Sequence, residues 1–523
     1  MLRYSTRRVA SLQAEVLVIG GGSTGAGVAR DAAMRGFSTV LVERGDLADG
    51  TTGRYHGLLH SGGRYAVKDP SAARECAVEN EILRRIAADC IEDTGGLFVS
   101  TQWDDRSFGD EFVAGCRETG VSVTEVSVGE ALRREPRLNP NISRAFAVRD
   151  ASLDPWKLVS ACARSVEQDG GRILRYHRVL DLDRDGAKVI GARVENELTG
   201  EELSIHADVV VNAAGAWAGQ IAALAGCKVA VLPGKGIMIA MNHRLVNSVV
   251  NRCKPPADGD IIVPIRTVSV IGTTDVQVAD PDELEVTQAE VEEMLDEGEK
   301  LVPGFRSARA LRVWAGARPL FSPEEATDTR EVSRSHALID HAARDGVTGL
   351  ITITGGKTTT FRLMAETAVD AVCTQLGVDR PCKTHVLPLP GSEAGDFYWL
   401  GSRLRAREPI PRSEEIICEC ELITRRRLEE AMERRHTTSL DDIRRTLRLG
   451  MGPCQGGFCI YRATGILHAV EQLDYHAANA ALLDFLQERW KGAYPILYGD
   501  QLRQARLDDW IFQGVLAVQH LPS

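Results

Sequence analysis

Four cysteines near the C-terminus have spacings that suit a soft metal centre. The chain reads C-x-C at Cys418 and Cys420, and C-x4-C at Cys454 and Cys459. Thiolates in such clusters hold zinc or an iron–sulfur centre. Structural zinc favours C-x2-C pairs, which neither pair matches, and the second pair lies in a glycine-rich loop whose N–H groups can donate to cluster sulfurs. The pattern therefore favours a [2Fe–2S] cluster, with zinc or uncoordinated thiols as the alternatives.

Many arginines surround these cysteines in the sequence. Such cations can offset the negative charge of a cluster or bind an acidic partner. The alternative is a set of solvated helix faces, on which they pair with Glu429, Glu430 and Glu433. The arginines are Arg425, Arg426, Arg427, Arg434, Arg435, Arg444, Arg445 and Arg448.

A dinucleotide fingerprint lies at the opposite end of the chain. Residues 15–20 form a predicted strand that enters a G-x-G-x-x-G loop, a helix is predicted over 26–35, and a second strand over 38–43 ends on an acid. The first two glycines allow a tight turn and a close approach of backbone N–H groups to a pyrophosphate, and the third lets the helix pack on the strand. The terminal acid can accept hydrogen bonds from a ribose diol. The predicted cofactor residues are Gly20, Gly22, Ser23, Thr24, Gly25 and Glu43.

Later segments indicate FAD instead of NAD. A loop rich in small and hydroxyl residues at 50–53, a strand at 172–179, a strand ending in Ala-Gly within 208–219 and a glycine pair at 355–356 all suit one dinucleotide. The helix that opens after the last pair can stabilise negative charge on a reduced flavin. These segments contribute the predicted cofactor residues Thr51, Thr52, Val179, Ala214, Gly215, Gly356, Lys357 and Thr358.

Composition excludes several classes of protein. The 523 residues are 44% hydrophobic and 26% charged, as in a globular α/β protein, and the net charge of −11 gives no support for a nucleic-acid partner. The basic first fourteen residues lack a following apolar segment, so no secretory signal is expected. The most apolar stretch, 209–227, is interrupted by polar residues and glycines, and we expect no membrane span. Without a secretory signal disulfides are not expected, and the eight scattered cysteines are predicted to be buried.

The fold expected from these elements is α/β. A Rossmann-type FAD-binding domain, similar to D-amino-acid oxidase, is predicted to carry an antiparallel-sheet substrate domain, followed by a small helical [2Fe–2S] domain and a helical tail. The FAD-dependent domain spans 1–380, with FAD-binding parts at about 13–70, 150–230 and 345–380, and substrate parts at about 71–149 and 231–344. A linker is predicted at 381–412, the cluster domain at 413–465 and the tail at 466–523. The substrate part 75–150 is expected to be largely helical.

The motifs together resemble a known family. Residues 51–67, with 272–275, 316–320, 329–331 and 355–357, are similar to the FAD-dependent glycerol-3-phosphate dehydrogenases. The C-terminal cysteines resemble the bacterioferritin-associated-ferredoxin-like [2Fe–2S] domain. The pairing of both resembles the catalytic chain of the anaerobic, multi-subunit members of the family, and it covers nearly the whole chain after residue 14.

This resemblance implies oxidation of sn-glycerol 3-phosphate to dihydroxyacetone phosphate by hydride transfer to FAD. A phosphate monoester is recognised by several cations, and arginine offers a bidentate fork. The resemblance nominates Arg64, Arg318 and Arg330 for phosphate or glycerol oxygens, Tyr65 as a hydroxyl donor and Lys357 beside the flavin, with Arg318 and Lys357 also counted as catalytic. A surface ion pair is the alternative for any single arginine.

Proton removal from the C2 hydroxyl requires a base. His60 is the expected catalytic residue, because it lies between the flavin loop and Arg64. The alternative is a histidine packed under the isoalloxazine and bonded to backbone. His56 in the same loop is a weaker candidate, and Ser61 stands where many relatives have glycine.

The cluster suggests that electrons leave to a protein partner, because a [2Fe–2S] centre accepts one electron at a time. By resemblance, a flavoprotein termed B and an iron–sulfur membrane anchor termed C would be the partner subunits that pass them to the quinone pool in anaerobic respiration on glycerol. The chain would then be cytoplasmic and peripheral on the inner membrane through these partners. Two rivals remain: an FAD and [2Fe–2S] amine, amino-acid or opine dehydrogenase, and a non-catalytic electron-transfer or redox-sensing protein.

Overall fold

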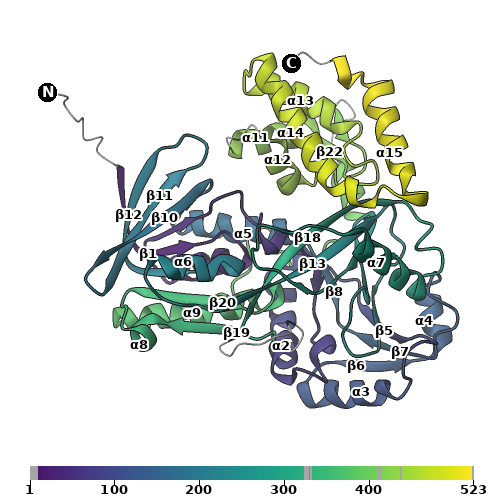
Figure 1. Cartoon of the computed structure of the whole chain (residues 1–523), viewed down its shortest axis with the longest axis horizontal. Helices are drawn as coiled ribbons and strands as arrows, with labels where there is room; N and C mark the ends of the chain where they lie inside the picture. The colour runs from purple at the N-terminus through teal and green to yellow at the C-terminus, as the bar shows by residue number, and fades with distance from the viewer. Residues whose placement is uncertain are drawn as a thin grey trace.

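The computed structural model describes residues 10–322, 329, 332–409, 411, 414–435, 437 and 439–520. Two large sheets lie side by side, and the C-terminal helices form a lobe above them (Figure 1). Arg330 lies outside the described residues, so the structure says nothing of its predicted role.

Sheet A carries the dinucleotide fingerprint. Its eight described strands have the order β10-β11-β12-β1-β2-β9, with β20 beside β12 and β19 beside β20. The pairs β12/β1, β1/β2, β2/β9 and β12/β20 are parallel, as the Rossmann prediction requires. The strands are β1 (Ala10–Ile19), β2 (Thr39–Val42), β9 (Arg172–Leu174), β10 (His177–Asp185), β11 (Lys188–Asn196), β12 (Glu202–Asn212), β19 (His336–Asp340) and β20 (Leu350–Gly355).

Sheet C is mostly antiparallel, with the order β17-β13-β16-β15-β14-β5-β7-β6 and β18 beside β13. Only its β14/β5 pair is parallel among the described strands. The strands are β5 (Gly96–Ser100), β6 (Val123–Val126), β7 (Arg144–Val148), β13 (Val231–Met241), β14 (Val249–Arg252), β15 (Ile261–Ile265), β16 (Val268–Gly272), β17 (Val276–Gln277) and β18 (Ala310–Phe321). A small sheet joins β3 (Leu58–Leu59), β4 (Ile91–Glu92) and β8 (Ala151–Leu153), and a hairpin-like pair joins β21 (Ile416–Cys418) to β22 (Ile423–Thr424).

Helices cover these sheets and build the C-terminal lobe. In the flavin-binding part, α1 and α9 pack together against sheet A, and α1 also contacts α5. The described helices are α1 (Ser23–Met34), α2 (Pro70–Ile86), α3 (Phe108–Thr119), α4 (Val128–Arg134), α5 (Pro155–Gln168), α6 (Ala218–Leu224), α7 (Gln288–Leu301), α8 (His341–Asp345), α9 (Phe361–Leu376), α10 (Ser402–Arg407), α11 (Arg425–Arg435), α12 (Leu440–Leu447), α13 (Cys459–Val470), α14 (Tyr475–Ala493) and α15 (Leu502–Asp509).

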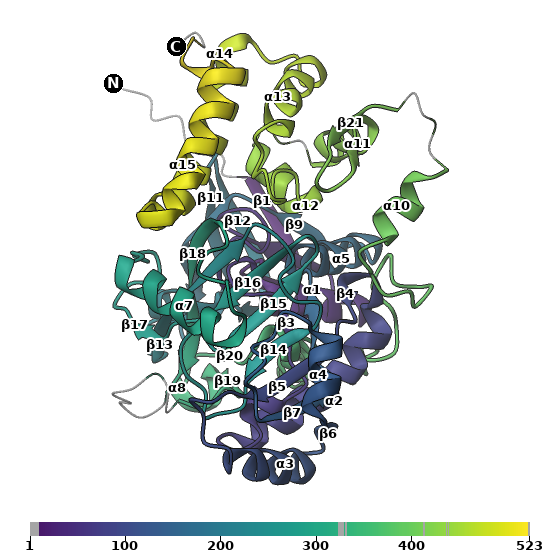
Figure 2. The same cartoon turned by 90° about the vertical axis from the view of Figure 1, so that its right-hand side faces the viewer.

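Two expectations about elements need correction. Residues 75–150 are not largely helical, because β5, β6 and β7 in this segment extend sheet C beyond β14. The predicted cluster domain and tail also do not separate at residue 465, since α13 crosses that position. Leu482 and Phe485 of α14 share one buried core with Ile417 and Leu467, so the two segments pack as one unit. We call residues 416–493 the cluster unit; Figure 2 shows its helices above the sheets, with α10 on the connecting segment.

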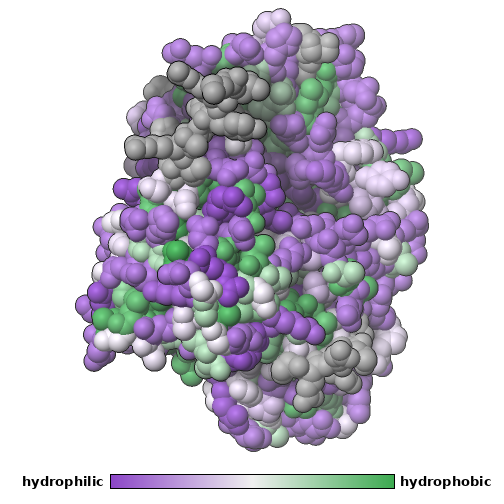
Figure 3. All heavy atoms as spheres, turned by 60° about the vertical axis from the view of Figure 1, so that its left-hand side comes forward, coloured by the Kyte–Doolittle hydropathy of each residue, from purple (hydrophilic) through white to green (hydrophobic). Residues whose placement is uncertain are grey.

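The surface is mixed in character. On the face shown in Figure 3, hydrophilic residues predominate and hydrophobic atoms form small separate patches. Among the described helices, none has the length and the hydropathy that a membrane crossing requires.

Candidate active site and metal centre

A cavity of about 1040 Å³ lies between sheet A and sheet C. It opens at the carboxyl ends of β1, β2, β12 and β20, where nucleotides bind in open α/β sheets. Most of the residues predicted for the cofactor and the substrate line this single space. They are Gly20, Gly22, Ser23, Thr24, Glu43, Thr51, Thr52, His56, His60, Arg64, Tyr65, Val179, Ala214, Gly215, Arg318, Gly356, Lys357 and Thr358.

The glycine loop has the geometry that its pattern requires. Gly20 adopts φ +110°, in the left-handed region that favours glycine. A Cβ on Gly25 would lie 1.8 Å from the carbonyl oxygen of Gly20, so α1 packs against the loop at a distance that only glycine allows. Gly25 therefore does not line the cavity but sets the position of the helix whose N-terminus faces it.

Glu43 is held by the glycine loop and by the segment that follows Glu43 itself. Its carboxylate accepts hydrogen bonds from the backbone N–H groups of Gly21 (2.6 Å) and Gly45 (2.9 Å). Burial raises its pKa, and these two hydrogen bonds oppose the rise. Each carboxylate oxygen keeps a second lone pair, so the group can still accept from a ribose hydroxyl.

A hydroxyl-lined loop follows. The Oγ1 of Thr52 accepts from the N–H of Ser23 (3.0 Å), and the Oγ1 of Thr51 donates to the carbonyl of Ala317 on β18 (2.5 Å). This loop therefore connects the first helix of the fingerprint to the antiparallel sheet, across the cavity.

One wall of the cavity gathers cations. Arg64 forms an ion pair with the fully buried Asp260 (2.8 Å). Arg318 lies 3.2 Å from the carboxylate of Asp275 and donates to the carbonyl of Thr274 (2.8 Å). Burial lowers the pKa of Arg318, and Asp275 opposes the fall.

Arg334 belongs to the same wall, and the sequence reasoning missed it. Its Nη2 lies 3.0 Å from the second oxygen of Asp275, while its Nη1 is buried without a hydrogen-bond partner in the described structure. It lines the cavity. The sequence signal that could have indicated Arg334 is its position two residues before β19, because β19 pairs with β20 and β20 leads into the glycine pair at 355–356. The sequence analysis nominated Arg330 for the phosphate instead, and Arg330 lies outside the described residues.

Lys357 joins this wall from the loop that follows β20. Its ammonium donates to the backbone carbonyl of Arg334 (2.8 Å) and lies 4.9 Å from the ring centroid of Tyr65. Burial raises the pKa of Tyr65 to about 12, so its hydroxyl stays protonated and can donate a hydrogen bond.

Two histidines lie next to the cations. The rings of His60 and Tyr65 are 5.2 Å apart, and those of His60 and His56 are 6.1 Å apart. Burial, then the neighbouring His56 and the cations Arg64 and Lys357, hold the pKa of His60 well below its usual value. The ring is therefore neutral near pH 7.

His56 is also neutral. Burial, with smaller contributions from Arg64 and Arg318, lowers its pKa to about 3. The N–H of Leu58 donates to its Nδ1 (3.2 Å), so Nε2 carries the ring proton. His56 is therefore a donor in the cavity, whereas the tautomer of His60 is not fixed in this way.

The four cysteines pair across the two motifs. The sulfurs of Cys420 and Cys454 are 3.7 Å apart, and Cys459 donates a hydrogen bond to Cys418. No three of these four sulfurs lie within 4.8 Å of one another. A tetrahedral zinc would require all sulfur–sulfur distances to be about 3.8 Å. Two separated pairs suit two iron atoms, each held by one cysteine from each motif.

Backbone N–H groups surround the sulfurs. The pKa of Cys454 falls to about 6, first because Cys420 donates to it and then because Gly456, Gly457 and Phe458 donate their N–H groups. A thiolate is the form that binds a metal. The glycine-rich loop thus supplies the hydrogen bonds expected from the sequence, and the donor set fits a [2Fe–2S] cluster.

Arginines of the cluster unit divide into two groups. Arg425 and Arg426 on α11 pair with Glu429 and Glu430 at the surface, as the solvated-face alternative predicts. Arg444 is instead buried within the cluster unit, beside Asp441. Arg445 and Arg448 are largely buried where the cluster unit meets the flavin-binding part, paired with Asp46 and Asp154. Neither interpretation of the sequence anticipated this internal interface.

Comparison with known proteins finds relatives for both parts of the chain. The model of the FAD dependent oxidoreductase family matches residues 15–365, and that of the BFD-like [2Fe-2S] binding domain matches residues 416–469. The chain is 44% identical to the A subunit of the anaerobic glycerol-3-phosphate dehydrogenase of Escherichia coli K12, over 97% of this chain and 98% of that protein. It is also 44% identical to the A1 subunit of the Haloferax volcanii enzyme, over 94% and 89%.

A solved structure has a similar fold. It is the glycerol-3-phosphate dehydrogenase from Bacillus halodurans complexed with FAD, at 24% identity and a TM-score of 0.57, covering 97% of this chain and 88% of that one. At this identity the likeness concerns the fold alone.

Proposed function

Because the chain belongs to the FAD-dependent oxidoreductases, and within them to the family of anaerobic glycerol-3-phosphate dehydrogenase A subunits, we propose how its residues perform that reaction. The protein oxidises sn-glycerol 3-phosphate to dihydroxyacetone phosphate with FAD, and its [2Fe–2S] centre carries electrons onward. When bound, FAD accepts the two electrons of the alcohol and the cluster passes them on singly.

The single observation that carries the residue assignment is the cation wall. Arg64, Arg318, Arg334 and Lys357 stand against two paired aspartates, Asp260 and Asp275. Asp258 also lines the cavity near Arg64, so three aspartates stand near four cations and the wall stays net positive, as an anionic phosphate monoester requires. In this proposal the buried, unpartnered Nη1 of Arg334 and the ammonium of Lys357 bind the phosphate.

His60 is the proposed base. Its neutral ring has a nitrogen lone pair, which can take the C2 hydroxyl proton while the C2 hydrogen leaves as hydride. The protonated hydroxyl of Tyr65 and the Nε2–H of His56 are proposed to hold the substrate oxygens.

Partner proteins complete the electron path. The relatives are named as one subunit of an enzyme, which implies further subunits. We propose that these are a flavoprotein, B, and an iron–sulfur membrane anchor, C, that delivers electrons to quinone. The chain would thereby lie on the cytoplasmic face of the inner membrane.

Anaerobic titration of the purified protein tests the substrate and the path together. Glycerol 3-phosphate should bleach the flavin absorbance and then the cluster absorbance, whereas amino acids should bleach neither. Bleaching by an amino acid and not by glycerol 3-phosphate would overturn the substrate assignment. A cluster that stays oxidised over many turnovers would overturn the electron path.

A further inference from the structure

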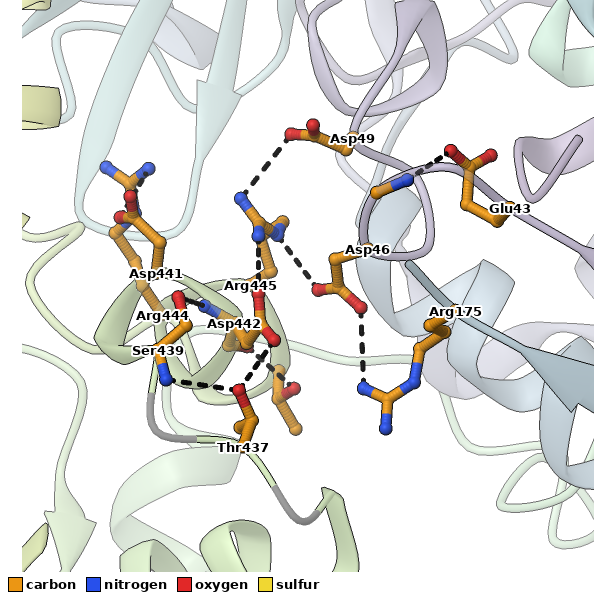
Figure 4. A network of polar contacts seen from close by, with 12 residues as sticks. Glu43, Asp46, Asp49, Arg175, Thr437, Ser439, Asp441, Asp442, Arg444 and Arg445 are labelled. Carbon is orange, nitrogen blue, oxygen red and sulfur yellow. Dashed lines mark hydrogen bonds and ion pairs between the residues drawn. The ribbon is translucent and has the colours of Figure 1, made fainter. Parts of the chain in front are cut away.

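Helix α12 of the cluster unit touches the loop that borders the FAD cavity. Arg445, in the last turn of α12, donates from Nε to the carboxylate of Asp46 (2.9 Å) and lies 3.5 Å from Asp49. These two aspartates belong to the loop between Glu43 and the hydroxyl residues Thr51 and Thr52. Figure 4 shows the guanidinium of Arg445 pointing into this loop, with Asp46 and Asp49 on one side and Asp442 on the other.

The contact is buried on the flavin side. The side chain of Asp46 is fully buried, and that of Arg445 is 15% exposed. Arg175 also lies near Asp46, but at 3.6 Å it is farther than Arg445. Buried pairs are screened little by solvent, so loss of one partner is costly. If Asp46 were exposed, water would solvate its charge, and its position would not depend on an arginine from a distant helix.

A second contact joins the same helix to the segment between β9 and β10. The hydroxyl of Tyr176 donates to the buried carboxylate of Asp442 (2.5 Å), which also accepts from Thr437 (2.8 Å). The backbone N–H of Tyr176 donates to the carbonyl of Gly45 (3.0 Å), and Val179 follows three residues later. Helix α12 therefore contacts both the loop that follows Glu43, through Asp46, and the neighbouring segment that contains Tyr176.

The side chain of Asp442 is used for the interface and not for capping its own helix. Ser439 caps α12 by accepting from the N–H of Asp442 (3.4 Å), but the N–H of Ser439 donates to Thr437 and not to the Asp442 side chain. The carboxylate that would complete a capping box is used for Tyr176 and Arg445 instead. The sequence position alone would not reveal this second use.

We propose that the docked cluster unit is a structural part of the FAD site, and that FAD binding and docking of α12 reinforce each other through Arg445, Asp46, Tyr176 and Asp442. Arg445 is a positioning residue, because it acts through loop 45–50. Coupling between sites is reciprocal, so weakening the interface must weaken FAD binding by the factor by which FAD stabilises the interface. This inference requires the FAD site but not the substrate assignment.

The decisive variant is Arg445→Gln, which keeps a polar side chain but shortens it and removes the charge. The FAD dissociation constant is measured from free-flavin fluorescence on dilution of the holoprotein, and cluster absorbance reports that the unit is folded. We expect FAD binding to weaken roughly 5- to 150-fold, the usual range of coupling factors. The matched control is Arg426→Gln, on the same unit but exposed and paired with Glu430, which should leave FAD binding unchanged.

A second pair of measurements avoids dependence on one variant. Tyr176→Phe removes one hydroxyl from the flavin side and should weaken FAD binding in the same direction by a smaller factor. In the wild-type protein, amide hydrogen exchange in α12 should quicken when FAD is removed. An Arg445→Gln protein with its cluster intact and wild-type FAD affinity would overturn the inference. If the Arg445→Gln variant loses its cluster, the wild-type exchange experiment decides: equal amide exchange rates in α12 with and without FAD would overturn the inference. A failure of glycerol 3-phosphate to bleach the flavin would leave these results unchanged.

Discussion

The sulfurs of Cys420 and Cys454 lie 3.7 Å apart although 34 positions separate them in the chain. Cys459 likewise pairs with Cys418, so each motif gives one ligand to each sulfur pair. The fold of α11 and α12 between the motifs brings the two halves together, with Ile417 and Leu467 in the shared core.

Removal of one cysteine should therefore remove the whole cluster. Cys454→Ser is expected to abolish the visible absorbance and the electron paramagnetic resonance signal of the reduced cluster, because a [2Fe–2S] centre needs both pairs. Metal analysis of the wild-type protein should find iron and acid-labile sulfide. Zinc in place of iron would disprove the [2Fe–2S] assignment. Cys373→Ser, at a scattered cysteine in the flavin-binding part, is the control.

Arg334 should contribute directly to substrate affinity. Arg334→Gln is expected to raise the KM for glycerol 3-phosphate about 10- to 150-fold, the equivalent of about 1.5–3 kcal/mol for a hydrogen bond to a charged group. Steady-state kinetics with an artificial acceptor measures the change. The exposed Arg74, paired with Glu118, provides the control variant Arg74→Gln. An unchanged KM would remove Arg334 from the phosphate site.

His60 should control the rate of flavin reduction. His60→Gln is expected to slow anaerobic bleaching by glycerol 3-phosphate about 10²- to 10⁴-fold, the usual contribution of a general base. Because the pKa of His60 lies well below 6.5, the ring stays neutral and the rate should not fall between pH 9 and 6.5 through this group. Stopped-flow absorbance measures both effects. Equal rates in the variant and the wild type would exclude His60 as the base.

His56 should make the protein less stable in acid. Its pKa is about 3 in the folded protein and about 6.5 when unfolded, so below pH 6.5 the unfolded state binds the extra proton. Above pH 6.5 His56 is neutral in both states and has no effect on stability through its protonation. Between pH 6.5 and 3 it lowers the free energy of unfolding progressively as the pH falls. Relative to His56→Gln, the wild-type free energy of unfolding should therefore fall by up to about 1.4 kcal/mol per pH unit in this window. Urea unfolding at pH 7, 6 and 5 measures the difference, and a constant difference would contradict it.

Gly25 should tolerate no side chain. Gly25→Ala places a Cβ 1.8 Å from the Gly20 carbonyl oxygen, so α1 must move away from the loop. We expect a loss of about 1–3 kcal/mol in stability together with loss of bound FAD. Thermal unfolding and flavin content measure these changes. Gly465→Ala, on α13 with open space around it, should leave flavin content unchanged.

Local patterns were sufficient for the elements that bind a dinucleotide. The spacing of Gly20, Gly22 and Gly25 predicted the turn and the helix because each glycine has a steric role within a few residues of itself. The strands expected at 15–20 and 38–43 agree with the end of β1 and with β2, since an apolar run bounded by turn residues is a short-range signal. The cysteine spacing likewise predicted the kind of centre, because ligand type is a property of the side chain.

Contacts between distant segments were decided only by the tertiary structure. Nothing near Arg445 indicates that it lies against Asp46, 399 positions away, instead of facing solvent like Arg426. The sequence analysis missed Arg334 because its proposed role depends on two things that only the fold provides. These are its ion pair with Asp275 and its place at the edge of the cavity, which the pairing of the sheets creates. The sequence by itself determined which residues can do the chemistry. Chain packing decided which of them share one cavity, because burial and long-range pairing depend on the whole fold.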